Sequence, residues 1–89
     1  MTERETVFIT GGSSGIGRAI ALRLANNGTA IVIADVDKDG ALETAKMITA
    51  TGGRSIAREV DVRDRSSIRA AADDALQEYG KIDGLVNCA

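Results

Sequence analysis

Histidine and proline are both absent from the 89-residue chain, and Cys88 is its single cysteine. Without histidine the chain cannot supply a Ser/His/Asp triad or a Cys/His pair. With one thiol it cannot form a Cys-x-x-Cys couple, a Cys/His zinc site or an internal disulfide. We therefore expect no metal site, and we expect the reducing environment of the cytoplasm.

Excess charge and long apolar runs are missing as well. Eleven basic residues stand against 13 acidic ones, a net charge of −2, so no basic field attracts nucleic acid or an anionic membrane surface. The longest apolar run covers residues 30–34, and residues 1–6 are mostly polar or charged. Such a pattern excludes a membrane span and a signal peptide. The sequence predicts a cytoplasmic protein that binds neither nucleic acid nor membrane.

Four short runs rich in β-branched and apolar residues predict strands at 6–10, 29–34, 55–60 and 81–86. Each intervening stretch has helical spacing, with apolar faces formed by Ile16, Ile20 and Leu24, by Ala41, Leu42, Ala45 and Ile48, and by Ile68, Ala72, Ala75, Leu76 and Tyr79. Asp37 fits the start of the second helix, Asp64 or Ser66 the start of the third, and Gly80 its end.

This alternation of strands and helices predicts an α/β fold. The first two strands are nearly continuous in apolar residues, which is typical of a parallel sheet covered by helices on both faces. Ligands of such sheets bind at the carboxyl ends of the strands. Functional residues are therefore expected directly after each predicted strand.

A glycine-rich loop, Thr10-Gly11-Gly12-Ser13-Ser14-Gly15-Ile16-Gly17, joins the first predicted strand to the first predicted helix. Glycines there allow backbone N–H groups to approach a phosphate, the helix N-terminus adds partial positive charge, and the two serines add hydroxyl donors. The alternative is a tight turn in which glycines supply positive φ angles. The position between a strand and a helix favours phosphate binding.

The glycine spacing distinguishes between types of phosphate loop. A Walker A loop needs Lys-Ser/Thr after its last glycine, but Arg18-Ala19 follows Gly17, so the hydroxyl that binds Mg²⁺ is missing. No frame fits Gly-x-Gly-x-x-Gly. The spacing present is Gly-x-x-x-Gly-x-Gly, at Gly11, Gly15 and Gly17.

Four motifs together resemble the short-chain dehydrogenase/reductase family. They are the loop 10–17, Asp35 after the second predicted strand, Asp61-Val62 after the third and Asn87-Cys88-Ala89 at the fourth. The resemblance implies a Rossmann-type fold, here an incomplete βαβαβαβ unit, and a dinucleotide cofactor. The cofactor-binding residues that it implies are Gly11, Ser13, Ser14, Gly15, Ile16, Gly17, Asp35, Asp61, Val62, Asn87 and Ala89.

Asp35 stands 18 residues after Gly17, close to the ~20 expected for an acid that accepts the adenosine 2′- and 3′-hydroxyls. A 2′-phosphate ~4 Å from it would cost about 4 kcal/mol per charge pair at an effective dielectric constant near 20. We therefore expect NAD, with NADP disfavoured. The alternative for Asp35 is a loop acid near a helix start, a role that Asp37 fits better. Arg18 either reaches a phosphate or is a solvated helix residue, and we favour the second.

The resemblance also implies roles for the later motifs. Asp61 would accept from the adenine amino group, and Val62 would pack on the ring or donate its N–H to it. Asp61 has an alternative as a capping acid of the third helix. Asn87 would lie near the cofactor ribose and tie strand ends together, and Ala89 would leave room for the sugar. Cys88 replaces the family's second Asn, and we interpret it as a small buried apolar residue.

The family's reaction is hydride transfer between the nicotinamide and an alcohol or carbonyl carbon, with a Tyr-x-x-x-Lys pair and a Ser as catalytic groups. Tyr79 is followed four positions later by Asp83, so we assign Tyr79 to the core and expect no catalytic residue in residues 1–89.

Residues 1–89 are then expected to be the N-terminal part of a single NAD(P)-binding domain, truncated after the fourth strand, in an enzyme that is a homo-oligomer when complete. Two alternatives are a stand-alone nucleotide-binding module and a methyltransferase using S-adenosylmethionine. The second usually has an acid where Thr10 stands.

Overall fold

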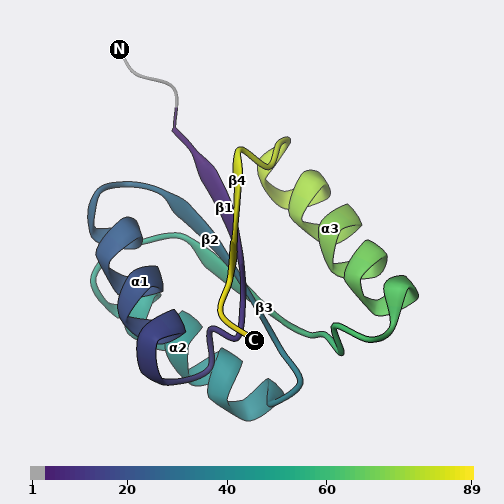
Figure 1. Ribbon diagram of the computed structural model, residues 1–89. Helices are drawn as coiled ribbons and strands as arrows, with labels where there is room; N and C mark the ends of the chain where they lie inside the picture. The colour runs from purple at the N-terminus through teal and green to yellow at the C-terminus, as the bar shows by residue number, and fades with distance from the viewer. Residues whose placement is uncertain (1–3) are drawn as a thin grey trace.

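The computed structural model describes residues 4–89 as a parallel sheet covered by helices (Figure 1). Its elements are β1 (Thr6–Thr10), α1 (Gly15–Asn26), β2 (Ala30–Asp35), α2 (Lys38–Ala50), β3 (Ser55–Glu59), α3 (Arg65–Tyr79) and β4 (Gly84–Asn87). The sheet has the strand order β3-β2-β1-β4 with all pairs parallel. The predicted Rossmann-type α/β fold is confirmed. The sequence argument against a signal peptide used residues 1–6, and residues 1–3 of these lie outside the described residues.

Helices cover both faces of the sheet, as the apolar strands predicted. Figure 1 shows α1 and α2 together on one face and α3 on the other. The core on the α1/α2 face consists of Ile9, Ala21, Ala25, Ile31, Ile33, Ala41, Ala45, Ile48 and Ala57. The core on the α3 face consists of Phe8, Val32, Ala34, Val60, Ala71 and Ala75. Alternate residues of β1 and β2 therefore point into opposite cores, as the two-residue period of a strand requires.

The buried face of α1 differs from the predicted one. Gly17, Ala21 and Ala25 are the buried residues of the helix, whereas Ile16 is 75% exposed. Ile20 and Leu24 pack only at the margin of the core. Small residues are buried here because α1 packs closely against its neighbours. The buried stripe of α1 therefore lies one position after the large apolar residues Ile16, Ile20 and Leu24.

Two apolar residues of the other predicted faces are also exposed. Leu42 is 41% exposed on α2 and Leu76 is 46% exposed on α3. On α2 the buried place is taken by Thr44, which is fully buried beside Ala45. A polar side chain in that position must find hydrogen-bond partners, and its partners prove to be part of the functional site.

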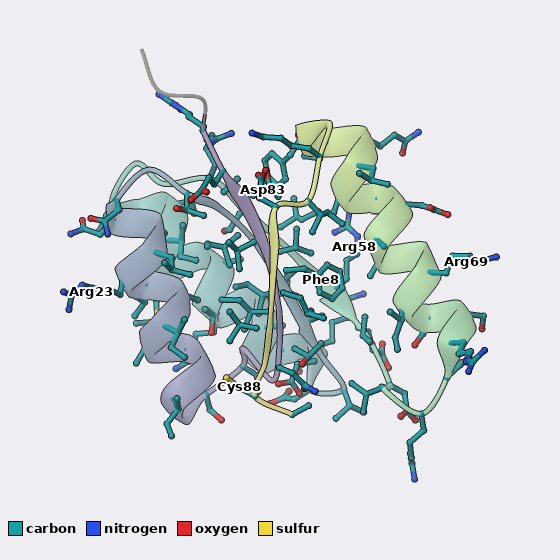
Figure 2. The ribbon with its side chains drawn as sticks, turned by 45° about the horizontal axis from the view of Figure 1, so that its top comes forward. Phe8, Arg23, Arg58, Arg69, Asp83 and Cys88 are labelled. Atoms are coloured by element: carbon teal, nitrogen blue, oxygen red, sulfur yellow. The ribbon has the colours of Figure 1, made fainter. Side chains whose placement is uncertain are left out.

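The last strand begins three residues later than predicted, at Gly84. Asp83 instead pairs with the start of β1: its carboxylate accepts from Thr6 N–H at 2.8 Å, and its own N–H donates to the Thr6 carbonyl at 2.8 Å. Figure 2 shows Asp83 at one end of β4 and Cys88 at the other. The β4 residues then run beside β1 in register, from Val7 opposite Gly84 to Thr10 opposite Asn87.

The predicted start of α2 and the predicted start and end of α3 are confirmed by their capping residues. Asp37 accepts from Gly40 N–H at the start of α2, and Asp64 accepts from Ser66 N–H at the start of α3. Gly80 ends α3 in the left-handed conformation, with φ 81°. Among the described residues, no helix is both long and apolar enough to cross a membrane.

Candidate functional site

The glycine loop is built by close contact between backbones. Gly11 has φ 75°, and a Cβ placed on it would lie 2.6 Å from the carbonyl carbon of Cys88. A Cβ on Gly17 would overlap the carbonyl oxygen of Gly11. The loop, the start of α1 and the end of β4 are therefore so close together that side chains at these two positions would push them apart. Gly15, with φ 59°, has open space where a Cβ would point.

The N-terminus of α1 differs from those of the other helices. Its N-cap residue, Ser14, makes no side-chain capping hydrogen bond, and no acidic residue stands in its first turn. By contrast, α2 and α3 are each capped by an aspartate. The first N–H groups of α1 thus keep their capacity to donate to an anion, and the helix dipole favours negative charge there.

Asp35 lies at the end of β2, facing the glycine loop. One carboxylate oxygen, Oδ2, accepts from Ser13 N–H at 3.2 Å, and the other, Oδ1, accepts from Asp37 N–H at 3.0 Å. Partial burial acts to raise the pKa of Asp35, but the hydrogen bonds from Asp37, Ser13 and Val36 outweigh it and lower the pKa. An ionised carboxylate only accepts hydrogen bonds and has about four lone-pair sites, and the Ser13 and Asp37 N–H groups at 3.2 and 3.0 Å use two of them.

Asp61 follows β3 and is held by its neighbour Arg63. The guanidinium donates through Nε to Oδ1 and through Nη2 to Oδ2, each at 3.1 Å. These hydrogen bonds are the main reason why the pKa of Asp61 is lowered. Arg63 is 87% exposed, and exposed ion pairs contribute little stability, so a ligand group can compete for this carboxylate at small cost. Asp64, rather than Asp61, caps α3.

Residues at the end of β4 contact the end of β1. Asn87 Oδ1 accepts from the Thr10 hydroxyl at 2.7 Å, and Cys88 N–H donates to the Thr10 carbonyl at 2.9 Å. The side chain of Asn87 therefore does tie neighbouring strand ends together, as the resemblance implied. Cys88 is half-buried rather than buried, which corrects the interpretation of this residue.

A cleft of about 530 Å³ opens where these strand ends meet. Its lining contains seven of the expected residues together with their neighbours: Gly11, Ser13, Ser14, Ala34, Asp35, Val36, Val60, Asp61, Val62, Arg63, Cys88 and Ala89. Gly15, Ile16 and Gly17 lie outside this lining, at the start of α1. Asn87 lines an adjoining apolar cleft of about 390 Å³ with Val62, Phe8 and Leu85 among others.

The cleft suits one half of a dinucleotide. It offers an ionised carboxylate beside a glycine-rich loop, and a helix start without a side-chain cap lies next to that loop. Apolar Val62 and a second carboxylate stand on its far side. A sugar diol, a phosphate and a flat ring each find partners of matching chemistry. Among residues 4–89, no three His, Cys, Asp or Glu side chains are grouped so as to hold a metal ion.

Arg18 is the residue whose role the sequence analysis misjudged. Its side chain is not the solvated one that the sequence analysis favours: only 23% of it is exposed, and its guanidinium donates to Thr44 Oγ1 at 2.8 Å and to the carbonyl oxygen of Ser13. Thr44 was not identified at all. The signal that points to it is a threonine inside the apolar stripe formed by Ala41, Ala45 and Ile48.

Comparison with known proteins gives concordant results. Residues 5–89 match the family model for short chain dehydrogenases. Hydroxysteroid dehydrogenase-like protein 2 of Homo sapiens is 47% identical over 91 aligned residues, which cover 94% of this chain and 22% of that protein. The chain therefore spans about a fifth of the length of this relative.

Solved structures agree with the sequence comparison. A hydroxysteroid dehydrogenase from Escherichia coli superposes with a TM-score of 0.90 at 35% identity, over 93% of this chain and 35% of that one. A short chain dehydrogenase/reductase from Burkholderia phymatum, solved in complex with NAD, gives a TM-score of 0.89 at 36% identity over 93% of this chain and 30% of that one. The arrangement of strands, helices and loops described above is therefore that of these enzymes' corresponding part.

Proposed function

The chain belongs to the short-chain dehydrogenase family, and from this we propose that it supplies the dinucleotide-binding part of an oxidoreductase that uses NAD(H) in preference to NADP(H). The observation that carries the proposal is the position of Asp35, whose carboxylate stands in the cleft with both oxygens oriented by backbone N–H groups. Membership of the family and the NAD bound to a structural relative support a dinucleotide cofactor. The choice between NAD and NADP rests on Asp35 alone.

In this proposal the cofactor lies across the carboxyl ends of the strands. Asp35 accepts hydrogen bonds from the adenosine 2′- and 3′-hydroxyls, and Asp61 and Val62 hold the adenine. Asn87 and Ala89 border the sugar on the nicotinamide side. The pyrophosphate is held by the loop and helix start, namely Gly11, Ser13, Ser14, Gly15, Ile16 and Gly17.

The bound cofactor supplies or accepts the hydride, and the described residues bind it and orient it. Nothing in the chain has the Tyr-x-x-x-Lys pattern, since its one tyrosine, Tyr79, precedes Asp83 by four positions. Tyr79 is half-buried against the α3 core, where burial raises the pKa of its phenol. We propose that the substrate of the whole protein is an alcohol or the corresponding carbonyl compound, and that the whole protein is a homo-oligomer.

A binding titration tests the cofactor proposal. The intact protein would be titrated with NADH, NADPH and S-adenosylmethionine, with calorimetry or nicotinamide fluorescence as the readout. We expect NADH to bind more tightly than NADPH and S-adenosylmethionine not to bind. Tighter binding of NADPH would refute the role of Asp35. NADH binding without turnover of a panel of alcohols and ketones would favour a binding module instead of an enzyme.

A further inference from the structure

Thr44 connects helix α2 to the glycine loop through a fully buried hydroxyl. It donates to the carbonyl oxygen of Gly12 at 2.8 Å, with the carbonyl of Gly40 at 3.2 Å as a second acceptor, and it accepts from Arg18 Nε at 2.8 Å. A valine has nearly the same shape as threonine, so packing alone does not require a hydroxyl at this position. The hydroxyl is explained by its partners, two of which belong to the loop and to the first turn of α1.

Arg18 extends the same connection. Besides Thr44, its guanidinium donates to the carbonyl oxygens of Ser13 and Gly40, the latter at 3.2 Å, and to Glu43 at 3.3 Å. Two successive carbonyls of the loop are therefore bound by side chains, that of Gly12 by Thr44 of α2 and that of Ser13 by Arg18 of α1. A lysine has a single ammonium group without the fixed fork of a guanidinium, so it cannot replace all these hydrogen bonds together.

The consequence for Asp35 follows from the geometry of the peptide unit. The Gly12 carbonyl and the Ser13 N–H belong to one planar trans peptide, so they point in opposite directions. Because Thr44 holds the carbonyl at 2.8 Å, the N–H is directed to the other side, where it donates to Asp35 Oδ2 at 3.2 Å. Hydrogen bonds linked in this way also strengthen one another.

We propose that Thr44 and Arg18 are positioning residues for cofactor selection: through the Gly12–Ser13 peptide they orient the Asp35 carboxylate that distinguishes NADH from NADPH. This inference rests on the proposed function of Asp35. It adds that selectivity depends on two residues, Arg18 of α1 and Thr44 of α2, that do not line the cleft. Losing the hydroxyl frees the peptide to rotate, and Asp35 then loses the N–H that fixes one of its oxygens.

The test compares three threonine variants of the intact protein. Thr44→Val removes the hydroxyl, Thr44→Ser retains it, and Thr49→Val makes the same change at an exposed position of α2 whose hydroxyl donates to Lys46 in the same helix. Dissociation constants for NADH and NADPH would be measured for each, with thermal melting alongside. We expect Thr44→Val to weaken NADH binding about threefold to tenfold, the effect of about one hydrogen bond.

The ratio of the two dissociation constants is the decisive readout. We expect Thr44→Val to lower the preference for NADH at least threefold, while Thr44→Ser and Thr49→Val keep it within twofold. A residue that only stabilises the fold would lower the melting temperature without changing this ratio. An unchanged ratio in Thr44→Val, or equal losses in Thr44→Ser, would overturn the inference.

Arg18→Lys provides a second variant in case Thr44→Val does not fold. It keeps the charge and is expected to lower the NADH preference in the same direction, whereas Glu43→Gln is expected to leave it unchanged because Arg18 keeps its other partners. An Arg18→Lys protein that is folded and fully selective would overturn the inference. If the wild-type protein itself prefers NADPH, the proposed function fails first, so the two failures are distinguishable.

Discussion

Replacing Asp35 with asparagine separates the charge of this side chain from its size. In the wild type, Oδ1 lies 3.0 Å from Asp37 N and Oδ2 lies 3.2 Å from Ser13 N. The amide of the variant keeps one acceptor oxygen and presents an NH₂ group in place of the other. One backbone N–H therefore loses its acceptor, and the side chain holds the ribose hydroxyls less well, so we expect NADH binding to weaken by about 1 kcal/mol.

The same substitution should strengthen the binding of NADPH. A 2′-phosphate about 4 Å from a carboxylate is repelled by about 1 kcal/mol in water and by about 4 kcal/mol at an effective dielectric constant of 20. Asp35 is only partly buried, so we take about 1 to 2 kcal/mol. Together the two effects change the preference by about 2 to 3 kcal/mol, or roughly 30- to 150-fold.

The assay is a pair of titrations of the intact variant with NADH and NADPH at constant ionic strength, because exposed charges are screened by salt. Asp39→Asn, an equal change of charge in the first turn of α2, is the matched control and should leave the preference within about twofold. Asp35→Ala, which also removes the charge, should likewise lower the preference for NADH over NADPH. A preference that Asp35→Asn leaves unchanged, or that Asp39→Asn changes as much, would refute the assigned contact.

Two further predictions concern the loop and pH. Gly17→Ala should reduce NADH affinity more than tenfold, because the added Cβ would overlap the Gly11 carbonyl. Gly84→Ala is the control and should be tolerated, since its Cβ would meet Val7 at an ordinary 3.6 Å. Calorimetric titration of both variants with NADH checks this prediction, and equal affinities would contradict it. Affinity for NAD⁺ should stay constant from pH 8 to pH 5, because partial burial of Asp35 is outweighed by hydrogen bonds that lower its pKa. The ionised form persists until the pH falls through that lowered pKa, and no histidine titrates in between. A loss of affinity between pH 7 and pH 5 that Asp35→Asn abolishes would contradict this assignment.

The sequence predicted the fold well because strands and turns leave local signals. The run Ala30–Asp35 is apolar on both faces, and the structure buries Ile31 and Ile33 against one layer of helices and Val32 against the other. The loop glycines were recognised from their spacing, and the structure adds the close contacts that explain two of them. Aspartate caps were predictable for the same reason, since each acts within a few residues.

Features that depend on contacts between distant residues were not predictable. The pattern of large apolar residues on α1 suggested a face containing Ile16, but the close approach of the helix to the glycine loop and to the sheet selects Gly17 and Ala21 instead. Arg18 was interpreted as solvated because two of its partners, Thr44 and Gly40, lie on α2, 26 and 22 positions further along the chain. The start of β4 was misplaced for the same reason, because Asp83 bonds to Thr6, 77 positions earlier.

The strand order has a consequence for how the cleft is assembled. Strands β1, β2 and β3 are neighbours in the sequence and in the sheet, whereas β4 pairs with β1 across a separation of 77 residues, at Thr6 and Asp83. Loop closure costs more entropy for a longer loop, and pairings distant in sequence tend to slow folding. Docking of β4 on β1 is therefore expected to follow the pairing of β1, β2 and β3. Since Cys88 and Ala89 belong to the lining of the cleft, this wall of the cleft forms only at that step.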